Sequence, residues 1–331
     1  MKNIYDYTRE ELAEFFEKKY NALQVFEWLY QKKIKTFDEV TNMNKVIIKD
    51  LKDNYKLNNL KIIKKEDSDY TIKYLIELED KNKVEAVLMF HNYGISLCVS
   101  TQVGCNLNCS FCESGKIKKI RDLNTYEIVL QLFLIEEDIN RKITHVVIMG
   151  IGEPFDNYKN VIRFIKIIND AKGLNIGARH ITVSTCGIVD KINEFSNEKF
   201  QVNLAVSLHA ANDNLRNELM PINKVYNIEV LLKSVKDYIR KTNRRVTFEY
   251  IVIANVNDSY DDAIELSNLL RNINCYVNLI EYNETSNIEY KRSKNTLKFY
   301  DILKKNNINV TIRRELGSNI SGACGQLSIG R

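Results

Sequence analysis

The chain has 331 residues, of which 44% are hydrophobic and 27% are charged. This balance is typical of a globular protein with a substantial core and excludes a disordered chain. The formal charge of +5, from 48 Lys and Arg against 43 Asp and Glu, is compatible with a nucleic-acid partner but does not by itself indicate one.

The N-terminal residues, Met1–Arg9, are polar and lack the apolar core of a signal peptide. No window of the sequence is long and apolar enough to cross a bilayer. We therefore expect a cytoplasmic protein with no membrane partner. The chain has seven cysteines, and three of them crowd into one short stretch. In a reducing compartment this pattern favours metal binding or catalysis over a disulfide framework.

The first 90 residues predict a small accessory domain of helices and strands. Up to about residue 55 the pattern is that of short amphipathic helices, clearest in Leu23–Tyr30, where apolar residues recur at helical spacing. Leu60–Phe90 then alternates between apolar and polar residues, which is typical of strands. We place the boundary with a second domain, residues 91–331, near His91–Gly94.

From Ile95 onward, strand patterns alternate with helical ones. Alternation of this kind predicts a parallel sheet, because parallel strands need crossover connections. The expected helices include one that begins at Thr125 with Asn124 and Glu127 as caps. Six or seven such units predict an open or closed α/β barrel, in which the chemistry lies at the carboxyl ends of the strands. The expected strands are Ser96–Ser100, His145–Met149, Ile181–Thr185, Val202–Leu208, Val246–Ile253, Tyr276–Ile280 and Val310–Ile312, and the other expected helices lie near Tyr158–Asp170, Ile228–Arg240, Asp258–Arg271 and Lys294–Lys304.

Cys105, Cys109 and Cys112 follow the first expected barrel strand with the spacing C-x3-C-x2-C. Three thiolates on one short loop can each bind one iron of a cubane cluster, which leaves the fourth iron open for another molecule. A closed zinc site needs a fourth ligand, and the nearest candidates, Cys98 and His145, lack finger-like spacing. We interpret the loop as a 4Fe–4S site, with zinc binding or structural thiols as the alternatives.

This motif, with an aromatic residue before its last cysteine, resembles the radical S-adenosylmethionine (SAM) superfamily. Further segments narrow the resemblance to the RlmN family, the bacterial dual-specificity ribosomal and transfer RNA adenine methyltransferases. The resemblance covers nearly the whole chain and implies an α/β fold, a partial or open barrel of the radical SAM type with a small N-terminal accessory domain. The segments that carry it are Ile4–Asp6, Phe26–Tyr30, Ser100–Cys105, Met149–Pro154, Ser207–His209 and Ala323–Leu327.

The activity implied by the resemblance is methylation of adenosine carbon 2, in 23S rRNA at the peptidyl transferase centre and in tRNA next to the anticodon. It implies a 4Fe–4S cluster on the three motif cysteines and SAM as cofactors. It also implies a flavodoxin or ferredoxin as electron donor, and a monomer whose residues 1–90 bind RNA. The residues that match the family's SAM contacts are Gly152, Glu153, Ser184, Ser207, Leu208, His209 and Asn283. Taken alone, His209 would be read as a core histidine.

Three further residues receive catalytic roles from the resemblance alone. Cys324, in a glycine-rich segment near the C-terminus, matches the methyl carrier, and the adjacent Arg313 and Arg314 are placed to stabilise its thiolate. Cys98, which would otherwise be assigned to the core, matches the cysteine that resolves the enzyme–RNA adduct through a transient disulfide. Glu85 matches the proton acceptor, although an isolated glutamate on an alternating strand is ordinarily exposed to solvent.

Four basic residues just after the cysteine loop, Lys116, Lys118, Lys119 and Arg121, lie at the expected mouth of the site and are candidates for RNA contact, with a solvated surface run as the alternative. Among the positions that depart from the family pattern, Glu113 replaces a small residue and Asn319 replaces an aspartate. The first would affect the cluster and the second the grip on RNA.

The closest alternative function is that of the related Cfr type, which methylates carbon 8 of the same ribosomal adenosine. Pro154 and the segment Arg313–Gly317 favour the carbon 2 enzyme. A non-catalytic iron–sulfur protein that binds RNA would not need both Cys324 and Glu85. A radical SAM activase of another protein would not explain the Cys324 segment.

Overall fold

The computed structural model describes residues 1–57, 60–285, 287–313 and 316–329. Its centre is a ten-stranded sheet in the order β14-β13-β12-β11-β10-β9-β6-β5-β4-β3. The strands from β6 to β14 run parallel, whereas β3 to β6 pair antiparallel. The bounds of the strands are β3 Lys61–Ser68, β4 Thr71–Glu77, β5 Lys83–His91, β6 Gly94–Cys98, β9 His145–Ile148, β10 Ile181–Thr185, β11 Asn203–Ser207, β12 Val246–Val252, β13 Cys275–Glu281 and β14 Val310–Ile312.

The predicted parallel strands and the partial barrel are confirmed. Each expected strand segment from Ser96 to Ile312 coincides with a strand of the sheet to within two residues. The parallel part is built from mostly apolar runs such as Val246–Val252, because helices cover its outer face. In the part of the chain that the structure describes, β14 and β3 are the two edges of the sheet, so the barrel is open.

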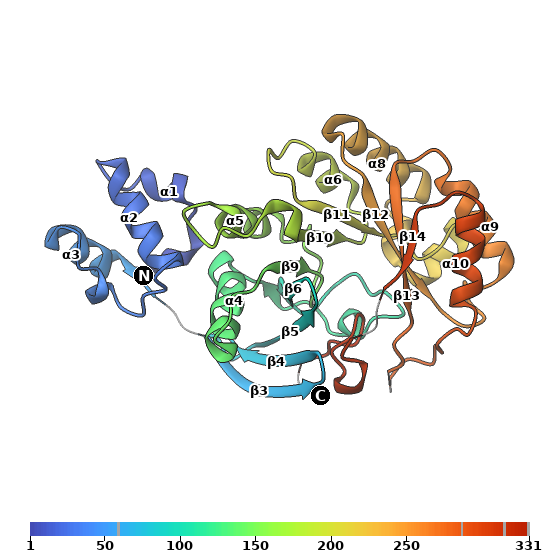
Figure 1. Cartoon of the computed structure of the whole chain (residues 1–331), viewed down its shortest axis with the longest axis horizontal. Coiled ribbons are helices and arrows are strands. Elements are labelled where there is room, and N and C mark those ends of the chain that lie inside the picture. The colour runs from blue at the N-terminus through green and yellow to red at the C-terminus, as the bar shows by residue number, and fades with distance from the viewer. Residues whose placement is uncertain (58–59, 286, 314–315, 330–331) are drawn as a thin grey trace.

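Helices cover the outer side of the parallel strands (Figure 1). The predicted start of α4 is confirmed, since Asn124 and Glu127 form a reciprocal capping box there. Two helices, α6 and α7, were not predicted, because seven residues are too few for a helical period to stand out. The bounds are α4 Thr125–Ile139, α5 Tyr158–Asn169, α6 Val189–Phe195, α7 Asp213–Leu219, α8 Ile228–Thr242, α9 Tyr260–Leu270 and α10 Thr296–Lys305.

The first 90 residues contribute to two different places. A lobe of three helices lies beside α4 and α5 (Figure 1), held by the edge-to-face rings of Tyr5 and Phe133 at 5.4 Å and by Arg9, whose Nε lies 2.8 Å from Asp170 Oδ2. The strands β3, β4 and β5 instead extend the main sheet. The division at residue 90 therefore stays a prediction. The lobe contains β1 Lys2–Asn3, α1 Arg9–Ala13, α2 Lys19–Tyr30, α3 Lys45–Asn54 and β2 Tyr55–Lys56.

The loop after β6 and the C-terminal segment meet at the carboxyl end of the sheet. The short pair β7 Gln102–Val103 and β8 Arg121–Asp122 closes the base of the cysteine loop. The C-terminal segment returns across β3, where the Ser68 hydroxyl lies 2.9 Å from Asn319 Oδ1. None of the helices in the described ranges is long and apolar enough to span a membrane.

Candidate active site

The three motif cysteines surround one cavity at the carboxyl ends of the strands. Cys105, Cys109 and Cys112 all line this space of about 160 Å³, which we call the cysteine-loop cavity. The sulfur of Cys112 accepts backbone hydrogen bonds from Ser114 and Gly115. Such N–H donors stabilise a thiolate sulfur and are among the features that tune iron–sulfur clusters.

The chemistry of this donor set fits a cubane cluster. In a cubane cluster each thiolate binds a different iron. The three cysteine sulfurs therefore need to surround a space, whereas the ligands of a single metal ion converge on one point. The structure has this arrangement, and within the described ranges no three His, Cys, Asp or Glu side chains converge on a single-ion site. The residues that would hold the cluster are therefore Cys105, Cys109 and Cys112.

Glu153 and Gly152 form the wall of the cavity after β9. The Glu153 carboxylate is buried and accepts the backbone N–H groups of Phe155 at 3.0 Å and Cys186 at 2.8 Å. Burial raises the pKa of Glu153, and these hydrogen bonds oppose that shift. Gly152 has a φ of +105°, and a Cβ there would lie 2.6 Å from the side chain of Gln102. Only glycine fits this turn.

Ser184, Ser207 and His209 line the same cavity. Leu208 is fully buried, and its carbonyl accepts a hydrogen bond from the guanidinium of Arg216 at 3.1 Å. The backbone N–H of Ile251 donates to Nδ1 of His209 at 3.0 Å, which places the ring proton on Nε2. Burial, helped by the charge of Arg216, lowers the pKa of His209 to about 3, so the ring is neutral.

Arg216 is a site residue that the sequence did not indicate. Its side chain has no exposed surface, and it donates to the carbonyls of Cys186 at 2.8 Å, Ser207 at 3.1 Å and Leu208 at 3.1 Å. These carbonyls lie at the end of β11 and in the segments that directly follow β10 and β11. One cation thus fixes two of the turns that line the cavity, and nothing in the pattern of α7 marks it.

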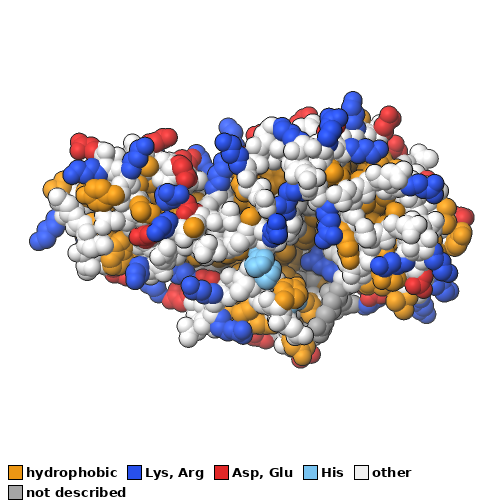
Figure 2. All heavy atoms as spheres, turned by 45° about the horizontal axis from the view of Figure 1, so that its top comes forward, with side chains coloured by type: hydrophobic (Ala, Val, Ile, Leu, Met, Phe, Trp, Pro, Cys, Tyr) orange, Lys and Arg blue, Asp and Glu red, His pale blue; other side chains and the backbone are white. Residues whose placement is uncertain are grey.

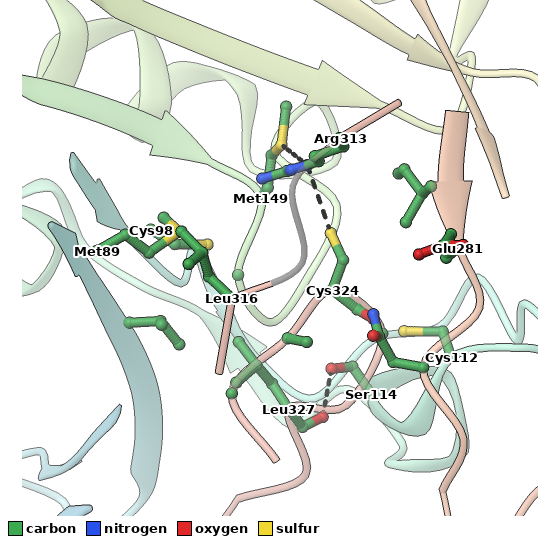
Figure 3. A pocket seen from close by; sticks show the side chains of 17 residues that line it. Met89, Cys98, Cys112, Ser114, Met149, Glu281, Arg313, Leu316, Cys324 and Leu327 are labelled. Atoms are coloured by element: carbon green, nitrogen blue, oxygen red, sulfur yellow. Dashed lines mark hydrogen bonds between the residues drawn. The ribbon is translucent and has the colours of Figure 1, made fainter. Parts of the chain in front are cut away.

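Cys324 and Cys98 line a second, adjoining cavity, which we call the two-thiol cavity (Figure 3). Cys324 also lines the cysteine-loop cavity. Nη1 of Arg313 lies 3.7 Å from Cys324 Sγ and 3.7 Å from Met149 Sδ. Cys324 and then Glu249 raise the pKa of Arg313, so the guanidinium is a fixed cation beside the thiol. Arg314, expected at the same place, lies outside the described residues.

Cys98 lies on the opposite side of this cavity from Cys324, next to Met89 and Leu316 (Figure 3). Burial raises the pKa of Cys98 to about 12. Asn283 also lines the two-thiol cavity rather than the cysteine-loop cavity. Its Nδ2 donates to the Cys324 carbonyl at 3.2 Å, while its buried Oδ1 has no partner among the described residues. An unsatisfied buried acceptor at the edge of a cavity suits a bound ligand.

Glu85 is buried rather than exposed, contrary to what its isolated position on a strand suggests. Only 1% of the residue is accessible, because the C-terminal segment covers β5 at this point. The Ser328 backbone N–H donates to Oε2 of Glu85 at 2.9 Å, and Lys73 Nζ lies 3.9 Å from Oε1. Glu85 does not line the two-thiol cavity. It lies under the chain that follows Cys324.

Glu249 on β12 is a second residue that the sequence analysis missed. It is buried, lines the cysteine-loop cavity and lies 3.2 Å from the amide nitrogen of Asn278. Burial raises the pKa of Glu249, and Arg313 opposes that shift. The sequence does contain one indication of this residue, a single carboxylate within the apolar run Val246–Ile253. A charged side chain is rarely buried in such a strand unless it has a partner or a function.

The basic run after the cysteine loop is largely paired within the protein. Lys119 makes ion pairs with Asp122 at 2.8 Å and Asp156 at 2.7 Å. Arg121 lies 2.7 Å from both Asp80 and Glu127, and Lys116 donates to the carbonyl of Asn287. Lys118 is exposed. The charge available for RNA at this mouth is therefore smaller than the sequence suggests.

The two departures from the family pattern have structural settings. Glu113 is buried, accepts from the Asn287 amide at 3.1 Å, and its backbone N–H donates to the Gly325 carbonyl at 2.9 Å. It thereby links the cysteine loop to the residue after Cys324. Asn319 lies against Ser68 of β3, away from both cavities.

Comparison with known proteins gives consistent matches over nearly the whole chain. The radical SAM superfamily matches residues 99–267, and the ribosomal RNA large subunit methyltransferase N-terminal domain matches residues 2–57. Proteins named probable dual-specificity RNA methyltransferase RlmN are similar in sequence. That of Spiroplasma citri is 51% identical over 99% of this chain and 97% of its own length, and that of Enterococcus faecalis is 53% identical over 98% and 95%.

A solved structure has the same architecture. The crystal structure of a radical SAM methyltransferase from Sphaerobacter thermophilus superimposes with a TM-score of 0.92 at 40% identity, covering 99% of this chain and 100% of that one.

The neutral state of His209 predicts a pH-dependent stability. With a pKa of about 3 in the folded chain against 6.5 when unfolded, the unfolded state takes up the proton first as the pH falls. Because of this residue, the free energy of unfolding should be about 2 kcal/mol lower at pH 5 than at pH 7. Denaturant titrations of the metal-free protein at the two pH values measure it.

His209→Asn, which keeps an acceptor for the Ile251 N–H, should remove most of that difference. An equal loss of stability in wild type and His209→Asn would contradict the assignment of a neutral buried ring.

Proposed function

This chain belongs to the RlmN family of dual-specificity RNA methyltransferases, within the radical SAM superfamily, and we propose that it methylates carbon 2 of adenosine in RNA. The substrates we assign are 23S rRNA at the peptidyl transferase centre and tRNA next to the anticodon. The observation that carries the proposal is that Cys324 lines both the cysteine-loop cavity and the cavity that holds Cys98.

We assign the 4Fe–4S cluster to Cys105, Cys109 and Cys112. When bound there with SAM, it supplies the one-electron chemistry that can remove a hydrogen atom from an unactivated methyl group. SAM is assigned to the wall of the same cavity and to its border with the two-thiol cavity, which Asn283 lines. The residues proposed to contact it are Gly152, Glu153, Ser184, Ser207, Leu208, His209 and Asn283. The unpartnered Oδ1 of Asn283 supports its place in this set.

The role proposed for Cys324 is that of methyl carrier. Its thiolate attacks the methyl carbon of SAM, so that a sulfur–carbon bond forms on Cys324 while the methyl–sulfonium bond breaks and S-adenosylhomocysteine leaves. Arg313, 3.7 Å from the sulfur, stabilises the anion before the attack. The detour through a cysteine has a chemical reason. Carbon 2 of adenine is not nucleophilic, so it cannot take a methyl group from SAM directly.

The role proposed for Cys98 is to release the product. Its sulfur attacks that of Cys324 in the enzyme–RNA adduct, so that a disulfide forms and the carbon–sulfur bond breaks. The released carbon takes up a proton and becomes the methyl group of the product. The placement of both thiols on one cavity supports this role.

Glu85 is proposed as the proton acceptor for the hydrogen on the target carbon. To accept this proton, the carboxylate must lose the hydrogen bond from the Ser328 N–H and contact the substrate instead. We also assign residues 1–90, with the lobe of α1 to α3, to RNA binding. The electron donor we assign is a flavodoxin or a ferredoxin.

The cluster assignment predicts about four irons and four sulfides per chain in protein purified without oxygen. Replacing Cys105, Cys109 or Cys112 by Ala should remove the iron, because each thiolate holds a different iron. Cys275→Ala, at a buried cysteine on β13, is the matched control and should keep it. Iron and sulfide assays with metal analysis measure this. Stoichiometric zinc in place of iron would contradict the assignment.

The role of Cys98 predicts a trapped intermediate. In Cys98→Ala, Cys324 should still attack the base, and the adduct should accumulate because no thiol can release it. A denaturing gel of protein from cells should show a shifted band that disappears after nuclease treatment. The band should be absent in Cys98→Ala combined with Cys324→Ala, and also in Cys275→Ala. A fully active, unshifted Cys98→Ala enzyme would return Cys98 to a packing role.

A further inference from the structure

A third cavity, which we call the lower hollow, lies below the two others on the same face of the sheet. Side chains of a strand alternate between faces, so residues two apart share a face. On β10, Thr182 lines the lower hollow and Ser184 lines the cysteine-loop cavity. On β12, Thr247 lines the lower hollow and Ile251 lines the cysteine-loop cavity. The hollow has a volume of about 530 Å³, which is in the range of small-molecule sites.

The lower hollow adjoins Cys324 through a layer of shared side chains. Met149 and Arg313 line all three cavities, and Glu249 lines the lower hollow and the cysteine-loop cavity. Arg313 contacts the Cys324 sulfur at 3.7 Å. A molecule that fills the hollow would therefore contact Arg313 and Met149, the side chains that separate the hollow from the reactive sulfur. The amide of Asn278 and the carboxylate of Glu249 give the inner wall groups that can bond to the edge of a base.

Four aromatic rings form a continuous array at the mouth of the hollow, and we call them the four-ring rim. His91 and Tyr93 stack at 4.6 Å with an interplanar angle of 7°. Tyr93 meets His145 edge to face at 5.2 Å, and His145 stacks on His180 at 4.2 Å. Burial, His180 and His91 lower the pKa of His145, so its ring is neutral near pH 7. Tyr93 is 68% exposed, and it lies in the turn between β5 and β6.

Cations without a carboxylate partner surround this rim. The guanidinium of Arg141 lies over the ring of Phe90 at 5.7 Å, and that of Arg245 lies over the ring of Tyr276 at 4.9 Å. Arg141, Arg179 and Arg245 are exposed, and Arg245 lines the hollow itself. None of the three has a carboxylate partner among the ion pairs of the described ranges, in contrast to Lys119 and Arg121. Figure 2 shows histidine side chains at the edge of a hollow, with Lys and Arg side chains gathered around it.

We propose that the target nucleotide of the RNA enters through the lower hollow, with a neighbouring base stacked on the four-ring rim and backbone phosphates on Arg179 and Arg245. Flat aromatic rings beside exposed cations are the two features that bind single-stranded RNA without a duplex. The hollow, with a volume of about 530 Å³, has room for a single base that has left its stack. This inference rests on the proposed function, because it takes RNA as the substrate.

The surface part of the inference is tested by Tyr93→Ala, with Tyr93→Trp as the conservative variant. Loss of the stacking ring should weaken the affinity for an RNA hairpin carrying the target adenosine about tenfold. KM should rise by a similar factor, and kcat should change little. Tyr93→Trp should restore binding. Tyr260→Ala, at an equally exposed tyrosine on α9, is the matched control and should bind like wild type. Fluorescence anisotropy measures the affinity.

The interior part is tested by Thr182→Trp, which fills the hollow, against the near-isosteric Thr182→Val. Thr182→Trp should still carry a methyl group on Cys324 in the mass of its C-terminal peptide, which reports a folded upper site. It should nevertheless methylate RNA at least tenfold more slowly than Thr182→Val.

Wild-type RNA methylation by Thr182→Trp, or wild-type affinity of Tyr93→Ala, would overturn the entry route while leaving the proposed function standing. Failure of the wild-type enzyme to methylate any RNA would instead remove the proposed function.

Discussion

The placement of Cys324 depends on how the chain that follows it is anchored. The Ser114 hydroxyl donates to the Leu327 carbonyl at 2.7 Å, and the Ser328 N–H donates to the buried carboxylate of Glu85 at 2.9 Å. A buried carboxylate without partners is costly, so Glu85 favours the conformation in which the C-terminal segment covers β5. The cysteine loop and β5, which are both far from Cys324 in the sequence, thus hold its sulfur at the junction of two cavities.

The inner face of the sheet is organised in layers along the strands. The carboxyl ends carry the cysteine loop and the turns that Arg216 fixes. The middle layer consists of Met149, Glu249 and Arg313, whose guanidinium touches the Cys324 sulfur. The lower layer is the polar hollow with its aromatic rim. In our proposal these layers hold the cofactors, the carried carbon and the base in that order, so that the carbon needs to move little between them.

The sequence predicted the features that depend on local spacing. The cysteine loop, the capping box at Asn124 and the apolar parallel strands are all read within a few residues. The features that it did not predict depend on contacts between residues that are far apart in the chain. Asp156, far from Lys119 in the sequence, pairs with it, and the C-terminal segment buries Glu85. For the same reason, β3 to β5 looked like part of a separate domain although they extend the main sheet. The roles of Cys98 and Cys324 came from the family resemblance, and the structure adds that they line one cavity.

In the reaction proposed here, the carbon added to RNA is first carried on Cys324. We would test this by mass spectrometry of adenosine from RNA treated with the enzyme and SAM that bears a fully deuterated methyl group. A methyl group that loses one hydrogen atom on the carrier and later gains a proton should reach the base with two of its three deuterium atoms. The expected product is 2-methyladenosine of this composition. A product that keeps all three deuterium atoms would show direct transfer of the methyl group and would exclude Cys324 as the carrier.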